Sequence, residues 1–183
     1  EVLGDQSQLR AQLQRDGVAL LAQRSRLPTS LAVVQLNNGQ PSYGFYREGV
    51  ADRDYSPDQI VQQLRQAPTP GVLHTGSLAL VPPEHEKVLA VLKEAKALGW
   101  TISVDVNLRP KLAADLPAYA RAALKVAALA DWIKASDEDM EALATVQSPL
   151  AAPSLNAAPA LVSVFTALGA QRVALTFGAQ GAH

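Results

Sequence analysis

Short runs of apolar and β-branched residues alternate along the chain with longer stretches whose apolar residues are spaced as on one face of a helix. Such runs are typical of strands buried in a parallel sheet, and such stretches predict amphipathic helices. The expected strands are 72–75, 101–106, 131–134 and 172–176. The expected helices are 82–98, 116–129, 136–145 and 160–168. Strands that alternate with helices of this length form βαβ units, whose right-handed crossovers make the strands parallel.

The first third of the chain predicts a β-hairpin. Two strands, 31–36 and 43–47, flank the sequence Asn37-Asn38-Gly39, which is a strong hairpin pattern. The other elements expected in this part are a helix at 5–16, a strand at 18–22 and a helix at 56–66.

This hairpin interrupts the order of strands and helices. We therefore assign residues 30–50 to a small β appendage and residues 1–29 and 51–183 to an α/β core. The chain starts at what resembles a strand exit and stops after a strand and a glycine turn. We expect it to be the central part of a longer protein.

Polar and glycine residues gather where four of the expected strands end. The four clusters are Gly76-Ser77, Asp105 with Asn107 and Arg109, Lys134 with Ser136 and Asp139, and Thr176 with Gly178 and Gly181. Carboxyl ends of parallel strands share one edge of a sheet, which is where open α/β sheets bind their ligands. A single cluster could be a charged strand exit in water, so the convergence of four is the main evidence for a site.

Two of these clusters admit a local interpretation as well as a functional one. Ser136 followed by three acidic residues has the pattern of a helix N-terminus, but carboxylates beside a phosphate can also hold Mg²⁺ through water. Lys134, just before them, could aim its ammonium group at a phosphate. The turn from Thr176 to Gly181 could bring N–H groups close to a phosphate or simply end the strand.

Composition narrows the classes of function. The 183 residues are 48% hydrophobic, carry a net charge of −1 and include no cysteine, which excludes disulfides and thiolate metal sites. No apolar run approaches the roughly 18 residues that span a membrane, and no basic surface for nucleic acid is indicated. We expect a cytoplasmic protein that binds a small molecule.

Several common site patterns are absent from the sequence. It has no P-loop, no Gly-x-Gly-x-x-Gly after a strand and no Gly-x-Ser-x-Gly. The three histidines lack the spacing of metal ligands, and His74 is expected to be a hydrogen-bonded core residue. Phe45-Tyr46-Arg47 could stack on a sugar, or could cover the core or a partner subunit.

Taken in order, the motifs resemble those of the ribokinase-like (PfkB) sugar kinases. They are Gly4-Asp5, Gly17-Val18, Pro28-Thr29, Phe45-Tyr46-Arg47, Ala51-Asp52, Gly76-Ser77, Asp105-x-Asn107-x-Arg109-Pro110, Lys134-x-Ser136-x-x-Asp139 and Thr176-x-Gly178-x-x-Gly181-Ala182. The resemblance covers essentially the whole chain and is strongest to the fructokinase branch, because of the runs from Asp105 to Pro110 and from Lys134 to Glu138.

The resemblance implies a three-layer α/β/α ribokinase-like fold with a mostly parallel sheet and a small β lid. It also implies an enzyme that uses ATP and Mg²⁺ to phosphorylate a sugar hydroxyl, with fructose as the first candidate, and that forms a homodimer through the lid. A non-catalytic member that binds sugar or nucleotide is an alternative, and a response-regulator-like domain fits least.

Residue roles follow from the same resemblance. The residues expected to bind sugar are Phe45, Arg47, Asn107 and Arg109, and Arg109 also acts electrostatically in catalysis. The residues expected to serve the nucleotide are Asp105, Lys134, Ser136, Thr176, Gly178 and Gly181. Asp139 replaces the glutamate of the family's Asn-x-x-Glu and would reach Mg²⁺ through water. The family's general base lies in a Gly-Ala-Gly-Asp segment that this sequence does not contain. Two arginines near the sugar would also suit an acidic ketose such as 2-keto-3-deoxygluconate.

Overall fold

The computed structural model describes residues 6–37, 40–147 and 150–183, which fall into two compact units, Glu1–Tyr55 and Ser56–His183. The assignment of residues 1–29 to the α/β core stays a prediction. None of the described helices is long and apolar enough to cross a membrane.

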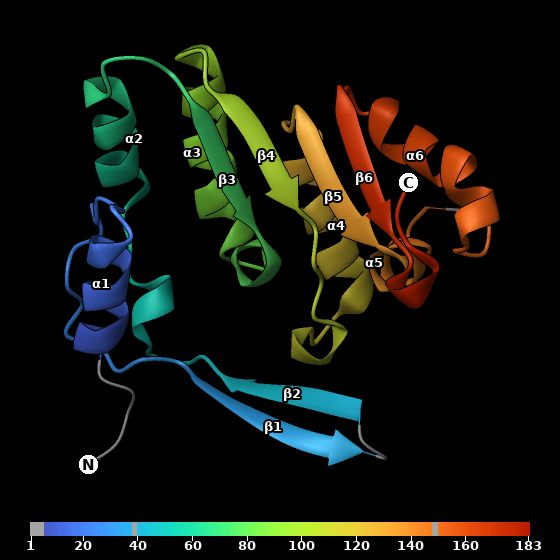
Figure 1. The fold of residues 1–183 in the computed structure, drawn as a ribbon, viewed down its shortest axis with the longest axis horizontal. Helices are drawn as coiled ribbons and strands as arrows, with labels where there is room; N and C mark the ends of the chain where they lie inside the picture. Colours follow the sequence, from blue (N-terminus) through green and yellow to red (C-terminus); the bar gives the residue numbers. More distant parts are fainter. Residues whose placement is uncertain (1–5, 38–39, 148–149) are drawn as a thin grey trace. The chain divides into compact units, whose positions relative to one another are not determined.

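The second unit is built on a four-stranded parallel sheet (Figure 1). Its strands, in spatial order, are β3 (Val72–Gly76), β4 (Thr101–Asp105), β5 (Trp132–Ser136) and β6 (Arg172–Thr176). Its helices are α2 (Pro57–Gln66), α3 (His85–Ala97), α4 (Leu116–Ala127), α5 (Asp137–Leu143) and α6 (Ala158–Thr166). Every strand and helix predicted for this unit forms, with small shifts at the ends.

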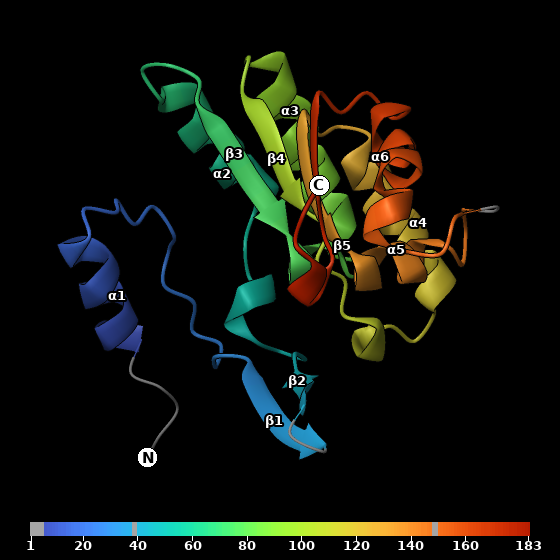
Figure 2. The same ribbon diagram turned by 45° about the vertical axis from the view of Figure 1, so that its right-hand side comes forward.

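Alternation along the strands places the core on one face of the sheet. Ile102 and Val104 of β4 and Ile133 of β5 are buried, whereas their neighbours in sequence are half-buried. Because each right-handed crossover leads to the next strand on the same side, α3, α4, α5 and α6 cover the same face (Figure 2). The three-layer arrangement implied by the resemblance is represented in this unit by two layers, the sheet and these helices.

The opposite face of the sheet carries polar side chains. His74 is exposed there and makes a 3.0 Å hydrogen bond with Ser103 of the neighbouring strand. The expectation of a hydrogen bond is confirmed, but the expectation that His74 lies in the core is wrong. Strand periodicity explains the difference, because His74 alternates with Leu73 and Thr75, which face the helices.

The first unit contains α1 (Gln6–Arg15) and the antiparallel hairpin of β1 (Leu31–Asn37) and β2 (Gln40–Tyr46). The hairpin confirms the prediction, although residues 38 and 39 of its turn lie outside the described residues. The strand expected at 18–22 does not form. Apolar character favours a strand there, but no described strand pairs with this segment to supply the hydrogen bonds that a strand requires.

Gly76, at the end of β3, should be the least replaceable of the described glycines. Its φ is 156°, and a Cβ built on it would overlap the carbonyl oxygen of Asp105 in β4. We expect Gly76→Ala to lower the free energy of unfolding by about 3 kcal/mol or more, through overlap added to backbone strain. Gly169→Ala is the matched control, because φ is 104° there but nothing lies within 4 Å of the added Cβ. Equal urea midpoints for the two variants would contradict the prediction.

Candidate functional site

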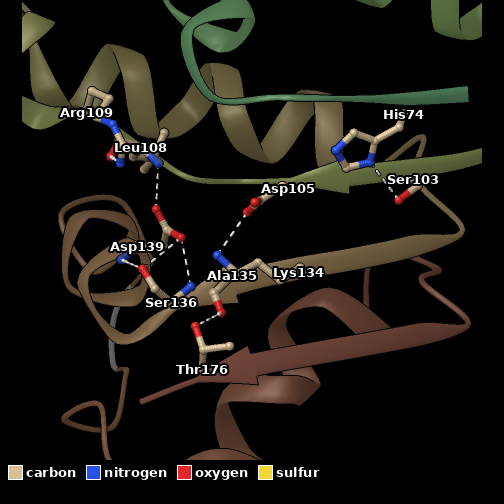
Figure 3. Close-up of polar contacts among 10 residues, drawn as sticks. All are labelled: His74, Ser103, Asp105, Leu108, Arg109, Lys134, Ala135, Ser136, Asp139 and Thr176. Carbon is tan, nitrogen blue, oxygen red and sulfur yellow. Dashed lines mark hydrogen bonds and ion pairs between the residues drawn. The ribbon is translucent and has the colours of Figure 1, made fainter. Parts of the chain in front are cut away.

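All four parallel strands end at residues that the sequence analysis assigned to the site. The last residues of β3, β4, β5 and β6 are Gly76, Asp105, Ser136 and Thr176. The register pairs Gly76 with Asp105, Asp105 with Lys134, and Ser136 with Thr176. The expectation that the four clusters meet at one edge is therefore confirmed, and Figure 3 shows the side chains of three of them together.

Beyond β4, buried and half-buried residues continue to alternate. Val106 and Leu108 are 1% and 4% exposed, whereas Asn107 and Arg109 are half-buried. The N–H of Val106 donates to the carbonyl of Lys134 at 2.9 Å, which extends the attachment of this segment to β5. The segment is thus held by its apolar residues and its backbone, while its polar side chains lie on the other side.

A cation and an anion face each other across β4 and β5. Lys134 Nζ lies 3.2 Å from Asp105 Oδ1, and both side chains are partly exposed. This is an ion pair by distance only, because Oδ1 is buried and accepts no hydrogen bond from any described residue. Because the Lys134 side chain is 39% exposed and its ammonium group has three donors, it can donate to an anionic ligand such as a phosphate as well.

Asp139 joins two of the clusters through a buried carboxylate. It is 2% exposed. Its Oδ2 accepts from the N–H and the hydroxyl of Ser136 at 2.7 and 2.9 Å, and its Oδ1 accepts from the N–H of Leu108 at 2.6 Å (Figure 3). The hydroxyl of Ser136 in turn accepts from the N–H of Asp139, which completes a capping box at the start of α5.

A glycine turn follows β6. Gly178 and Gly181 have φ values of 53° and 105°, conformations that favour glycine, and nothing lies within 4 Å of a Cβ built on either residue. The N–H of Phe177 donates to the carbonyl of Gly181 at 2.8 Å and closes the turn, and an antiparallel bridge pairs Thr176 with Ala182. Open space beside the turn is compatible with a phosphate, which remains the predicted ligand.

Phe45 and Arg47 belong to the first unit. Phe45 is half-buried in β2, opposite Ala32. The guanidinium group of Arg47, whose side chain is only 10% exposed, donates from Nε and Nη2 to Asp52 Oδ2 at 2.9 and 2.6 Å. The carboxylate of Asp52 therefore holds Arg47 in place and neutralises it.

Mg²⁺ would find few direct ligands in this arrangement. No group of three or more histidine, aspartate and glutamate side chains in the described parts of the chain is placed to hold a metal ion. Both oxygens of Asp139 already accept protein hydrogen bonds. The residues present fit a metal held mostly by water and ligand phosphates, and the indirect role of Asp139 stays a prediction.

Three contacts escaped the sequence analysis. They are the bond from Leu108 to Asp139, the ion pair of Arg47 with Asp52, and the close approach of Gly76 to Asp105. The spacing of Ser136 and Asp139 indicates the capping box, but no local pattern connects Asp139 to a residue 31 positions earlier.

Comparison with known proteins gives consistent matches. Residues 2–183 match the profile of the pfkB family of carbohydrate kinases. A fructokinase from Rhizobium leguminosarum bv. trifolii is 32% identical over 157 residues, which make up 85% of this chain and 44% of that protein. The chain thus spans less than half the length of this relative.

Solved structures show the same fold. The structure of a fructokinase with bound ATP from Xylella fastidiosa matches with a TM-score of 0.71 at 25% identity, over 96% of this chain and 55% of that one. An aminoimidazole riboside kinase from Salmonella enterica matches with a TM-score of 0.70 at 23% identity, over 96% of this chain and 54% of that one. At this lower identity the second match shows the fold alone.

The capping box at α5 should contribute to stability in two separable parts. We expect Ser136→Ala to lower the free energy of unfolding by about 1 kcal/mol, the usual loss of a helix cap. Asp139→Ala should cost about 2–4 kcal/mol, because it also leaves the buried N–H of Leu108 without its acceptor. Urea unfolding measures both. The exposed neighbour Glu138→Gln is the control, with a change within about 0.5 kcal/mol. An Asp139→Ala loss no larger than that of Ser136→Ala would contradict the prediction.

Proposed function

The chain belongs to the pfkB family of carbohydrate kinases, and on this premise we propose that the protein transfers a phosphoryl group from ATP to a hydroxyl of a sugar, with fructose as the first candidate. The observation that carries the proposal is the meeting of four strand ends at one edge, where Arg109 and Lys134 supply positive charge and a glycine turn lies beside them. Fructokinases among the relatives, one of them solved with ATP, support the choice of substrate and nucleotide.

Phosphoryl transfer depends mainly on position and charge stabilisation, and the edge of the sheet can provide both. In this proposal Arg109 binds near the transferred phosphate, with Asn107 beside it on the sugar side. The nucleotide phosphates lie along Lys134, Ser136 and the turn from Thr176 to Gly181, and Asp105 orients Lys134 through their ion pair. We assign no general base to these 183 residues.

Mg²⁺ completes this proposal as a second cofactor. When bound, it neutralises charge on the phosphates. The family position of Asp139 supports an indirect contact through water, and its shorter side chain than glutamate is compatible with that. We also place the protein in the cytoplasm, in agreement with its lack of cysteine.

The neutral sugar fits the first unit better than an acidic one. Phe45 and Arg47 are the side chains proposed to face the sugar from the lid. The carboxylate of Asp52 already pairs with Arg47 at 2.6 Å, so this guanidinium adds little net positive charge for an acidic ligand. Fructose therefore ranks above 2-keto-3-deoxygluconate, whose carboxylate would need an uncompensated cation.

We further propose that the hairpin forms a homodimer. Strand register places Leu31, Val33 and Tyr46 on one face of the hairpin, and these side chains are 45%, 39% and 68% exposed. Phe45 lies on the other face, opposite Ala32. A two-stranded ribbon with apolar side chains on the face away from the proposed substrate is suited to packing against a second copy.

The substrate proposal predicts a clear order in a sugar panel. With ATP and Mg²⁺, we expect kcat/KM for fructose to exceed that for 2-keto-3-deoxygluconate by roughly tenfold or more, because Arg47 is neutralised. A coupled assay for ADP release measures both.

In the same assay Arg109→Ala should lower kcat/KM about 100-fold, whereas the exposed neighbour variant Lys111→Ala should change it little.

A higher kcat/KM for the acidic ketose would refute the proposal that fructose is the substrate, but it would still support the proposal that the protein is a sugar kinase. No turnover with any sugar in the full-length protein, together with retained nucleotide binding, would instead favour the non-catalytic alternative.

The dimer proposal predicts that one charge on the hairpin face that carries Leu31, Val33 and Tyr46 breaks the assembly. Val33→Lys should raise the dimer dissociation constant at least about tenfold, because the ammonium group would be buried without a partner in the interface. Sedimentation equilibrium measures the constant. Leu21→Lys, which places the same charge on a 61% exposed residue of the same unit but outside the hairpin, is the control and should leave it unchanged. A monomeric unsubstituted protein, or equal constants for the two variants, would refute the dimer.

A further inference from the structure

The segment after β4 is anchored on both sides of a residue in an uncommon conformation. Asn107 has a φ of 38°, in the left-handed region that residues other than glycine rarely adopt and that asparagine adopts more readily than most. On one side the N–H of Val106 is bonded to β5, and on the other the N–H of Leu108 is bonded to Asp139. Such a conformation persists when its surroundings determine it from both sides.

A continuous set of bonds runs from Asp139 to Arg109. Asp139 Oδ1 accepts from the N–H of Leu108 at 2.6 Å, and the carbonyl of the same Leu108 accepts from Arg109 Nη1 at 3.2 Å. Leu108 itself is 4% exposed and packed in the core. The orientation of Arg109 is therefore tied to a backbone unit whose position is fixed by a buried carboxylate.

The capping of α5 does not account for the hydrogen bond between Asp139 Oδ1 and the N–H of Leu108. A capping box needs one acceptor for the Ser136 backbone, and Oδ2 of Asp139 supplies it. Oδ1 serves no group of the helix and reaches the exit of a different strand instead. Since an ionised carboxylate forms stronger hydrogen bonds than a neutral acceptor, the bond to Leu108 is well suited to hold a loop.

We propose that Asp139 is a positioning residue, which holds Asn107 and Arg109 in the geometry for phosphate binding through its bond to the Leu108 N–H. This inference rests on the proposed function, in which Arg109 faces a phosphate. It goes beyond a water-mediated contact with a metal, because its effect travels through the protein backbone and needs no ion.

The direction in which anion affinity changes when the Asp139 carboxylate is removed distinguishes a positioning role from simple charge repulsion. Removal of a carboxylate near an anion site strengthens anion binding if the carboxylate acts only by repulsion. Removal of a positioning carboxylate weakens binding, because Arg109 loses its orientation. Glu138→Gln removes the same charge from an exposed position in the same helical turn, so it gives the electrostatic contribution alone.

The experiment measures the affinity of the full-length protein for inorganic phosphate in a buffer with EDTA and no Mg²⁺. It compares Asp139→Ala, Arg109→Ala, the double variant and Glu138→Gln. We expect Asp139→Ala and Arg109→Ala each to weaken phosphate binding about tenfold, and the double variant to be no weaker than Arg109→Ala alone. Glu138→Gln should equal or slightly exceed the unsubstituted protein.

Amide hydrogen exchange tests the bond itself. In Asp139→Ala the N–H of Leu108 should exchange about 10- to 100-fold faster than in Glu138→Gln, whereas the N–H of Val104 within β4 keeps its rate. Ser136→Ala loosens the helix start but keeps Oδ1, so it should leave Leu108 protected. If Asp139→Ala does not fold, Asp139→Asn takes its place in both measurements. It keeps the volume of the side chain but removes the charge, and its amide has one acceptor oxygen in place of two for the N–H groups of Leu108 and Ser136.

Each outcome decides the proposal. Phosphate affinity that is unchanged or increased in the Asp139 variant overturns the proposal. A double variant whose loss of phosphate affinity equals the product of the losses in Asp139→Ala and Arg109→Ala also overturns it. So does an unchanged exchange rate of the Leu108 N–H in Asp139→Ala. Phosphate affinity that is insensitive to Arg109→Ala overturns it as well. A protein that phosphorylates no sugar but shows the expected phosphate and exchange results refutes the kinase proposal and supports the positioning role.

Discussion

Burial of Val106 and Leu108 beyond the end of β4 is the constraint on which the candidate site depends. These two side chains continue the apolar face of the strand beyond Asp105, its last residue, so the segment that carries Asn107 and Arg109 has a fixed path instead of a free loop. Hydrophobic burial of this kind has no direction of its own. Direction comes from the N–H groups of the same two residues, bonded to Lys134 and Asp139.

The parallel register converts this local order into a site. Because the four strands are parallel and each crossover leads to the adjacent strand, all four carboxyl ends lie on one edge, and residues far apart in sequence become neighbours. Asp105 and Lys134 are register partners and form an ion pair at the strand ends. Gly76 makes the adjacent approach possible, because any side chain there would overlap the backbone of Asp105.

The two units differ in construction, and the roles proposed for them differ accordingly. The second unit has a buried core beneath its sheet and carries charged groups at a rigid edge. The first unit contains α1 and a hairpin with exposed apolar side chains on both faces, held near its end by the pairing of Arg47 with Asp52. A thin ribbon of this type gains stability from what packs against it, which agrees with a role at a ligand and at a partner.

The sequence alone determined the order of strands and helices in the second unit, the parallel sheet, the hairpin and the clusters at the strand ends, because periodicity and helix-start patterns are local properties. It also indicated the capping box from the spacing of Ser136 and Asp139. The tertiary structure decided the rest. It exposed His74, left residues 18–22 without a strand, and gave Asp139 its bond to Leu108. Each of these depends on which segment lies alongside, and pairing between residues distant in sequence leaves no periodic trace in either of them.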